Sequence, residues 1–248
     1  MALIKTPEEI KILKKGGKIL GAIRDELANL VEPGMSTLEL ENMAKKLFKN
    51  SGGQPSFLGY EGFPATTCIS VNDEVVHGIP RKDKIMHDGD IVGIDVGLEY
   101  QGLYTDTAVT VAVGTIDKKI SELLAVTKKA LAIGIDKVKS GGHIGDIGQA
   151  IQAYVEKKGY SVVRSLVGHG VGHAVHEPPR IPNFGESGTG EKIQAGMVLA
   201  LEPMVNIGEY GVTTKDDNWT IVTEDGKYSA HFEHTIVVTK NGAEIITK

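Results

Sequence analysis

This sequence has little cysteine and no long apolar segment. Among its 248 residues only Cys68 is a cysteine, which excludes an internal disulfide framework and a cysteine-rich zinc module. No hydrophobic run approaches the roughly 20 residues that a transmembrane helix needs. Charged residues such as Lys5, Glu8 and Lys11 interrupt the segment Met1–Leu20, so we expect no signal peptide and a cytoplasmic protein.

The chain also lacks the basic excess that is typical of nucleic-acid-binding proteins. Its 27 Lys and Arg residues are outnumbered by 32 Asp and Glu residues, for a net charge of −5. We therefore expect neither a nucleic acid nor a membrane as a partner. The hydrophobic content of 41% and the charged content of 24% are those of an ordinary soluble globular protein.

The order of predicted elements occurs twice along the chain. In the first half, Thr6 and Ser36 each begin a capping box that predicts a helix, and the second helix ends near Gly52–Gly53. Extended sequence follows from Thr66 to Val76. An apolar stretch that predicts a buried strand then ends at Asp95.

The second half repeats this order. It predicts helices at about 117–138 and 145–158, then an apolar strand that ends at Glu202, 107 residues after its counterpart in the first half. This spacing indicates an internal duplication with halves of roughly 1–115 and 116–248. We expect the whole chain to form a single pseudo-twofold domain; a chance likeness of two halves is the alternative.

Two carboxylates, Asp95 and Asp106, flank a predicted hairpin turn at Gly97–Gly102. Residues that are equidistant from such a turn face each other, so we expect the two side chains to meet. Two ionised carboxylates repel by about 4 kcal/mol at a separation of about 4 Å and an effective dielectric constant near 20. Either shared protons or bound metal ions must offset this repulsion.

The second half supplies two more acids in apolar sequence, Glu202 and Glu233. If pseudo-symmetry brings all four acids together, rather than leaving them as separate strand ends, they balance two divalent cations. His169, His173 and His176 lie in Gly- and Pro-rich sequence that is typical of a site loop, and they are candidate nitrogen ligands. This donor set favours manganese, iron(II) or cobalt over a structural zinc cage. It predicts hydrolysis by a water molecule. Two bound metal ions would lower the pKa of this water toward about 7.

Ordered motifs across the chain resemble those of the type I methionine aminopeptidases. They are Cys68–Asn72, His77–Pro80, Gly93–Gly97, Thr105–Ala108, Gly168–Gly172, His176–Pro179, Glu202–Met204 and Phe232–Thr235. The resemblance covers essentially the whole chain and implies an α+β pita-bread fold. In that fold two pseudo-symmetric halves flank an active site on a curved antiparallel sheet. It also implies removal of the initiator methionine from nascent polypeptides whose second residue is small.

The resemblance implies a role for each site residue. Two divalent ions (cobalt, manganese, iron(II) or zinc) would be held by Asp95, Asp106, His169, Glu202 and Glu233. Glu202 would also act as the catalytic base, His176 would stabilise the tetrahedral intermediate, and His77 would contact the substrate near the scissile nitrogen. The methionine side chain would lie among Tyr60, Phe63, Cys68, Trp219 and Val175. From the residues alone, an ordinary buried thiol is the simpler interpretation of Cys68.

His231 departs from the family pattern, in which glutamine is more usual at this position. We expect it on a strand, sharing the face of Glu233, where it would support the metal site. An X-Pro peptidase of the same fold, a non-catalytic protein-binding member and a metal-free amidinohydrolase are the alternatives. X-Pro enzymes usually carry an additional N-terminal domain, whereas Thr6 begins the first helix at once; the other two lose ligands that this chain retains. Ribosome contacts stay open, and a monomer is the default.

Overall fold

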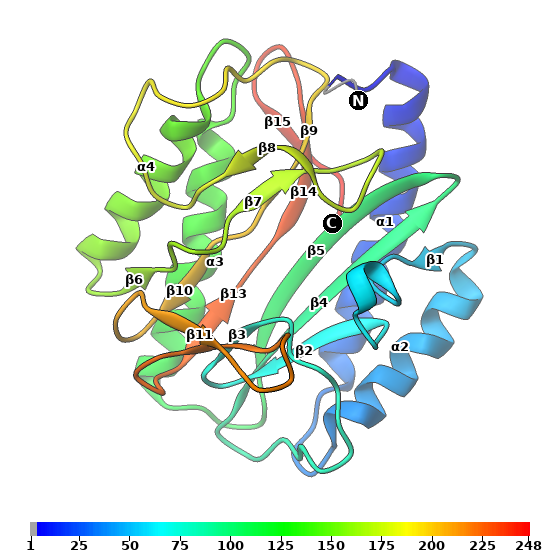
Figure 1. Cartoon of the computed structure of the whole chain (residues 1–248), viewed down its shortest axis with the longest axis vertical. Coiled ribbons are helices and arrows are strands. Elements are labelled where there is room, and N and C mark those ends of the chain that lie inside the picture. The colour runs from blue at the N-terminus through cyan, green and yellow to red at the C-terminus, as the bar shows by residue number, and fades with distance from the viewer. Residues whose placement is uncertain (1–3) are drawn as a thin grey trace.

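The computed structural model describes residues 4–248, in which paired helices flank a set of mostly antiparallel strands (Figure 1). The helices are α1 (Pro7–Leu30), α2 (Thr37–Ser51), α3 (Lys118–Lys137) and α4 (Ile144–Lys157). The strands of the first half are β1 (Gln54–Pro55), β2 (Thr67–Val71), β3 (Glu74–Val76), β4 (Ile91–Tyr100) and β5 (Leu103–Ala112). Those of the second half are β6 (Ser161–Val162), β7 (Gly168–Gly170), β8 (Glu177–Ile181), β9 (Val198–Leu201), β10 (Met204–Asn206), β11 (Val212–Thr214), β12 (Ile221–Thr223), β13 (Ser229–His231), β14 (His234–Val238) and β15 (Ala243–Ile245).

Within residues 4–248, no helix is both long and apolar enough to cross a membrane. The expectation that Met1–Leu20 is not a signal peptide falls partly on residues 1–3, which lie outside the described residues. From Pro7 onward that segment belongs to α1.

Helices α1 and α2 begin where the sequence predicts. The Glu9 carboxylate accepts the N–H of Thr6 at 2.7 Å, and the Thr6 hydroxyl accepts the N–H of Glu9 at 3.2 Å. Ser36 and Glu39 form the same reciprocal pair at α2. Each pair satisfies backbone donors that a helix start leaves without partners. Gly52 then ends α2 at a φ of 80°, a left-handed conformation that glycine adopts without steric cost.

The two halves repeat one arrangement of helices on strands. Helices α1 and α2 contact strands of the first half, and α3 and α4 contact strands of the second. Figure 1 shows the two helix pairs on opposite sides, with the strands β4, β5 and β14 between them. Each helix pair covers its own apolar core, which includes Leu20 and Leu40 in the first half and Leu123 and Ile147 in the second. The strands between the cores are therefore available to build a shared site.

The alternation of side chains along β4 directs Asp95 toward the region between the two cores. Val92, Ile94 and Val96 are fully buried on the face of β4 that packs against the first core. Because successive side chains of a strand point to opposite faces, Asp95 lies on the other face.

The register of the β4–β5 hairpin corrects one prediction. The strand continues past Gly97 to Tyr100, so that two residues form the turn instead of six. As a result Asp95 pairs with Ala108, and Asp106 pairs with Gly97. The prediction that the two acids lie directly opposite each other is wrong. They are diagonal neighbours on one face, a spacing at which side chains still interact.

Threonine side chains join β5 of the first half to β13 and β14 of the second. The Thr235 hydroxyl accepts the N–H of Asp106 at 2.9 Å and donates to the Asp106 carbonyl at 2.7 Å. Thr107 donates to the Glu233 carbonyl at 2.8 Å, and the Glu233 N–H donates to the Ala108 carbonyl at 2.9 Å. These bonds hold Asp106 and Glu233, one acid from each half, side by side.

Candidate metal centre

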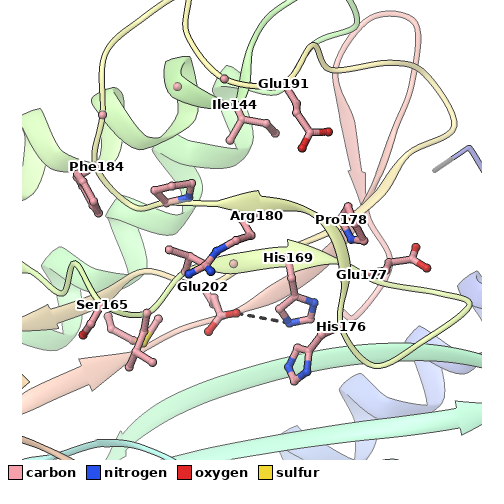
Figure 2. A pocket seen from close by; sticks show the side chains of 18 of the residues that line it. Ile144, Ser165, His169, His176, Glu177, Pro178, Arg180, Phe184, Glu191 and Glu202 are labelled. Atoms are coloured by element: carbon pink, nitrogen blue, oxygen red, sulfur yellow. Dashed lines mark ion pairs between the residues drawn. The ribbon is translucent and has the colours of Figure 1, made fainter. Parts of the chain in front are cut away.

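Strand β7 brings His169 close to the acids. It lies between β8 and β9 in a sheet of order β15-β14-β9-β7-β8, and His169 pairs with Ala200 of β9. Glu202 comes directly after β9. The His169 Nε2 atom is consequently 3.5 Å from the Glu202 Oε1 atom, the contact that is dashed in Figure 2.

All of the predicted metal-binding side chains line one cavity of about 120 Å³. They are Asp95, Asp106, His169, Glu202 and Glu233. Asp106, His169 and Glu233 each offer a ligand atom, and these atoms lie within 4.8 Å of one another. That spacing suits donors that converge on one cation.

Burial raises the pKa of each of the four acids. It raises the pKa of Asp95 to about 7. Burial, followed by repulsion from neighbouring acids, raises the pKa values of Asp106, Glu202 and Glu233 well above their ordinary range. One carboxylate oxygen each of Asp95, Asp106 and Glu233 is buried and accepts no hydrogen bond from residues 4–248. Buried oxygens without hydrogen-bond donors, in a cluster of like charge, fit divalent cations, which would favour the ionised acids.

The orientation of His169 also suits a metal ligand. Its Nδ1 atom lies 2.8 Å from the Gly170 carbonyl oxygen, to which an Nδ1–H donates. The lone pair of Nε2 is thereby directed at the acids. Burial, with a smaller effect of His176, lowers the pKa of His169 to about 3. The ring is therefore neutral near neutral pH, as metal ligation requires.

His231 is near the acids but not in the predicted way. Strand β13 ends at His231, so the prediction that it shares a strand face with Glu233 is wrong. Its Nε2 atom instead lies 3.6 Å from the Glu202 Oε2 atom, whereas His169 contacts the other oxygen of the same carboxylate, Oε1. Metal titration of the His231→Gln variant tests whether this contact supports the site; an unchanged affinity would remove that role.

An apolar chamber adjoins the acids. Phe63, Cys68 and Val175 are buried there in one cluster, against the partly exposed Tyr60 and Trp219. The ring centroids of Phe63 and Trp219 are 5.1 Å apart in an edge-on arrangement. The side chains predicted to hold methionine are thus neighbours.

Sequence reasoning missed Phe57, which lines the same cavity and is also buried. No local pattern in Ser56-Phe57-Leu58 distinguishes this residue from an ordinary core position. Cys68 pairs directly with Asp95 across β2 and β4. Burial and the nearby acids raise the pKa of its thiol, which is therefore neutral.

Two histidines, His176 and His77, lie near both the acids and the chamber. The ring of His176 lies 4.4 Å from that of His169, and its Nδ1 atom is 3.0 Å from the Tyr60 hydroxyl oxygen. The ring of His77 is 6.3 Å from that of Trp219. Desolvation lowers the pKa of His77 to about 4 and lowers that of His176 as well. Both rings are neutral near neutral pH, and each can donate one hydrogen bond.

The third histidine of the loop lies elsewhere. His173 Nε2 is 2.8 Å from Glu9 Oε1 at the start of α1, so its prediction as a nitrogen ligand is wrong. Lys5 forms a buried ion pair with Glu177, the residue after His176. The chain before α1 thus holds the loop that carries His176.

The Lys5→Met variant should lose about 3–5 kcal/mol of unfolding free energy, because Glu177 then remains buried without its lysine partner, and only the His173 Nδ1 atom lies nearby, 3.9 Å from its Oε2 atom. Denaturant titration measures the loss. The double variant Lys5→Met/Glu177→Met should regain most of it, since no buried charge is left. Lys14→Met is the matched control: its ion pair with Glu244 is 41% and 48% exposed, so about 1 kcal/mol or less is expected. Equal losses in the Lys5 and Lys14 variants would contradict this reasoning.

Residues 11–240 match the sequence profile of Metallopeptidase family M24. The chain belongs to this family. It is 48% identical over 247 residues to the methionine aminopeptidase of Clostridium perfringens, a match that covers 100% of this chain and 99% of that protein. It is 46% identical over 248 residues to methionine aminopeptidase 1 of Bacillus subtilis, with 100% of each chain covered. Family membership makes the protein a metal-dependent hydrolase and implies divalent metal ions.

Solved structures confirm the pita-bread fold. The methionine aminopeptidase of Thermotoga maritima superimposes with a TM-score of 0.97 at 48% identity, covering 99% of this chain and 98% of that chain. The prolidase of Pyrococcus furiosus gives a TM-score of 0.81 at 26% identity and covers 99% of this chain. The match spans 65% of the prolidase chain.

Proposed function

We propose that this protein is a methionine aminopeptidase, a hydrolase that removes the initiator methionine from nascent polypeptides with a small second residue. The observation that carries the proposal is one cavity in which an acid and histidine cluster adjoins a small aromatic chamber. The full-length relatives described above carry the same activity in their names. The chamber suits the methionine side chain, since a thioether packs well on aromatic faces.

Two divalent ions, of cobalt, manganese, iron(II) or zinc, would be held by Asp95, Asp106, His169, Glu202 and Glu233. When bound, such ions polarise the scissile carbonyl and lower the pKa of a water toward about 7. Glu202 is the catalytic base in this proposal: it would take a proton from the attacking water and pass it to the leaving amine. Its pKa is raised by burial and by Asp95, which suits a group that must both accept and release a proton.

His176 would donate a hydrogen bond to the scissile carbonyl oxygen. The Tyr60 hydroxyl supports this role, because by donating to Nδ1 it leaves the proton of the neutral ring on Nε2. That Nε2–H can then stabilise the oxyanion of the tetrahedral intermediate. His77, beside Trp219, would contact the substrate near the scissile nitrogen.

The catalytic unit in this proposal is the single domain 1–248, with halves of roughly 1–115 and 116–248. The contact between the halves supports a single catalytic unit, because the neighbouring acids Asp106 and Glu233 come from different halves. We propose a cytoplasmic monomer that meets polypeptides as they leave the ribosome.

Turnover of metal-loaded protein on short peptides tests the function. Met-Ala-Ser should be cleaved, whereas Ala-Pro-Ala and formyl-Met-Ala-Ser should not, since the aromatic chamber needs methionine and the free amine faces the acids. Met-Leu-Ser should be slower by roughly 10–100-fold, because a bulky second residue crowds His77 and His176. Faster release of alanine from Ala-Pro-Ala than of methionine from Met-Ala-Ser would favour the X-Pro alternative. Comparable rates on Met-Ala-Ser and Met-Leu-Ser would contradict the predicted size selection.

A further inference from the structure

A second, larger cavity adjoins the metal centre, and none of the side chains predicted to hold methionine lines it. This groove has a volume of about 990 Å³ and shares His77, His169, His176 and Glu202 with the small cavity. From there it passes Arg180 and ends near Phe184 and Ile144 (Figure 2). If methionine occupies the chamber, the rest of the polypeptide has to leave along this groove.

Arg180 projects into the groove next to the metal centre. It lies on β8, the edge strand of its sheet, and pairs in register with His169 on β7. Residues that pair in register share a face of the sheet, with Cβ atoms about 5 Å apart. The side chain of Arg180 therefore emerges beside the predicted ligand His169, and both line the groove (Figure 2). It is exposed, so a substrate can reach it.

The guanidinium group of Arg180 has no partner among residues 4–248. It takes part in none of the hydrogen bonds, ion pairs or cation–π contacts found among residues 4–248. Arg164, by contrast, stacks 4.3 Å from the ring centroid of Tyr210. Three acids line the groove: Glu202 is a proposed metal ligand, Glu177 is already paired with Lys5, and Glu191 lies near Ile144 (Figure 2).

We propose that Arg180 is a specificity-determining residue that binds a carboxylate carried by the substrate shortly after its second residue. The inference rests on the proposed function, which places the leaving polypeptide in the groove. An extended chain advances about 3.3 Å per residue, so the third and fourth residues pass within reach of a side chain that begins beside His169. Guanidinium binds carboxylate through two parallel hydrogen bonds, which an amide or an ammonium group cannot match. The carboxylate is either an acidic side chain or the carboxyl terminus of a short peptide.

Competition between matched peptides tests the proposal on metal-loaded protein. The peptides are amidated Met-Ala-Xaa-Gly-Gly and Met-Ala-Gly-Xaa-Gly, with Xaa being Asp, Asn or Lys, and Met-Ala-Gly as free acid and as amide. Wild type should prefer Asp over Asn about two- to fivefold in kcat/KM at one of these positions, as expected for a partly exposed pair. The preference should appear mainly in KM and should fade in about 0.5 M salt. A gain for free-acid Met-Ala-Gly without a gain for Asp would identify the terminal carboxylate as the ligand.

Two variants of Arg180 distinguish direct contact with the substrate from a long-range effect of charge. Arg180→Gln should remove the preference for a carboxylate, and Arg180→Glu should turn it into a preference for Lys. Lys118→Glu makes the same charge change at a side chain that is 92% exposed on α3, and it should keep the wild-type preference. An equal shift in the Lys118 and Arg180 variants would overturn the proposal in favour of a long-range field. Loss of metal in Arg180→Glu, measured alongside, would overturn it in favour of a role as counter-ion to Glu202.

The two proposals fail in different ways. If wild type cleaves none of the Met-Ala peptides, the proposed function fails. If it cleaves all of them at equal rates, and the Arg180 variants do the same, only the role of Arg180 is lost.

Discussion

The Asp106→Asn variant should lose its activity and yet, without metal, melt at a higher temperature than metal-free wild type. Loss of activity follows because Asp106 is a proposed ligand that lies within 4.8 Å of the donor atoms of His169 and Glu233. The loss should exceed the roughly 10–100-fold reduction that removing an outer hydrogen-bonding partner of a metal site causes. The gain in stability follows from the charges of the acids. Asparagine has nearly the same shape as aspartate but does not add to their repulsion.

The pH dependence of this gain has a definite sign. Burial and the neighbouring acids raise the pKa values of the cluster in the folded protein, that of Asp95 to about 7, whereas unfolded carboxyl groups titrate near 4. Between these values the four acids bind more protons in the metal-free folded protein than in the unfolded chain. The contribution of these acids to the free energy of unfolding therefore falls as pH rises from about 4 to about 7 and beyond, and recovers as pH falls. Buried histidines such as His77 and His169, whose pKa values are lowered, contribute in the opposite direction, but equally in variant and wild type. Asp106→Asn removes one of the groups that cause the fall.

Thermal melts in chelator measure this effect. At about pH 7.5 the variant should melt higher than wild type, and near about pH 4.5 the difference should shrink, because the wild-type acids are then protonated. Asp136→Asn, at an exposed position of α3, is the matched control and should change neither value. Added metal should reverse the order, since a ligand of the folded state stabilises the protein that binds it. A metal-free variant that melts below wild type at the higher pH would show that repulsion among the acids does not dominate.

Features that depend on neighbouring residues could be predicted from the sequence. The capping boxes at Thr6 and Ser36 are examples, because each contact joins residues three apart. The position of Glu202 directly after a buried strand was also predictable, since apolar runs of strand length are visible in the sequence. Asp95, by contrast, lies within β4, which continues to Tyr100. That these acids meet was inferred from pseudo-symmetry. The structure adds the physical means, which is the hydrogen bonding of Thr107 and Thr235 across the join.

Features that depend on exact backbone path could not be predicted. The position of the hairpin turn decides which residue Asp95 faces: a turn at Gly97–Gly102 places it opposite Tyr104, whereas the turn at Gln101–Gly102 places it opposite Ala108. Glycines at both Gly97 and Gly102 made the longer turn equally reasonable. His173 and His176 are three residues apart in similar sequence. Only the shape of the loop sends one to Glu9 and the other to the cavity.

The histidines that do reach the centre should have separable roles. His176→Ala should lower kcat by roughly 10²–10³-fold, as loss of one oxyanion donor does, with metal content nearly unchanged. His169→Ala should instead lower metal affinity, because it removes the nitrogen that faces Asp106 and Glu233. The two rings are only 4.4 Å apart, so their different tasks rest on orientation: His176 contacts Tyr60, and His169 faces the acids.

The Tyr60→Phe variant should have an effect on kcat that is intermediate between wild type and His176→Ala. It keeps the aromatic ring of the chamber but removes the hydroxyl that lies 3.0 Å from His176 Nδ1. If that hydroxyl holds the proton of His176 on Nε2, kcat should fall by less than in His176→Ala, while KM for Met-Ala peptides should change little. Metal analysis and steady-state kinetics on the three variants decide the matter together. Equal metal loss in His169→Ala and His176→Ala would contradict the separation of roles. A change confined to KM in His176→Ala would mean that this ring binds substrate and transition state alike, and so does not stabilise the oxyanion.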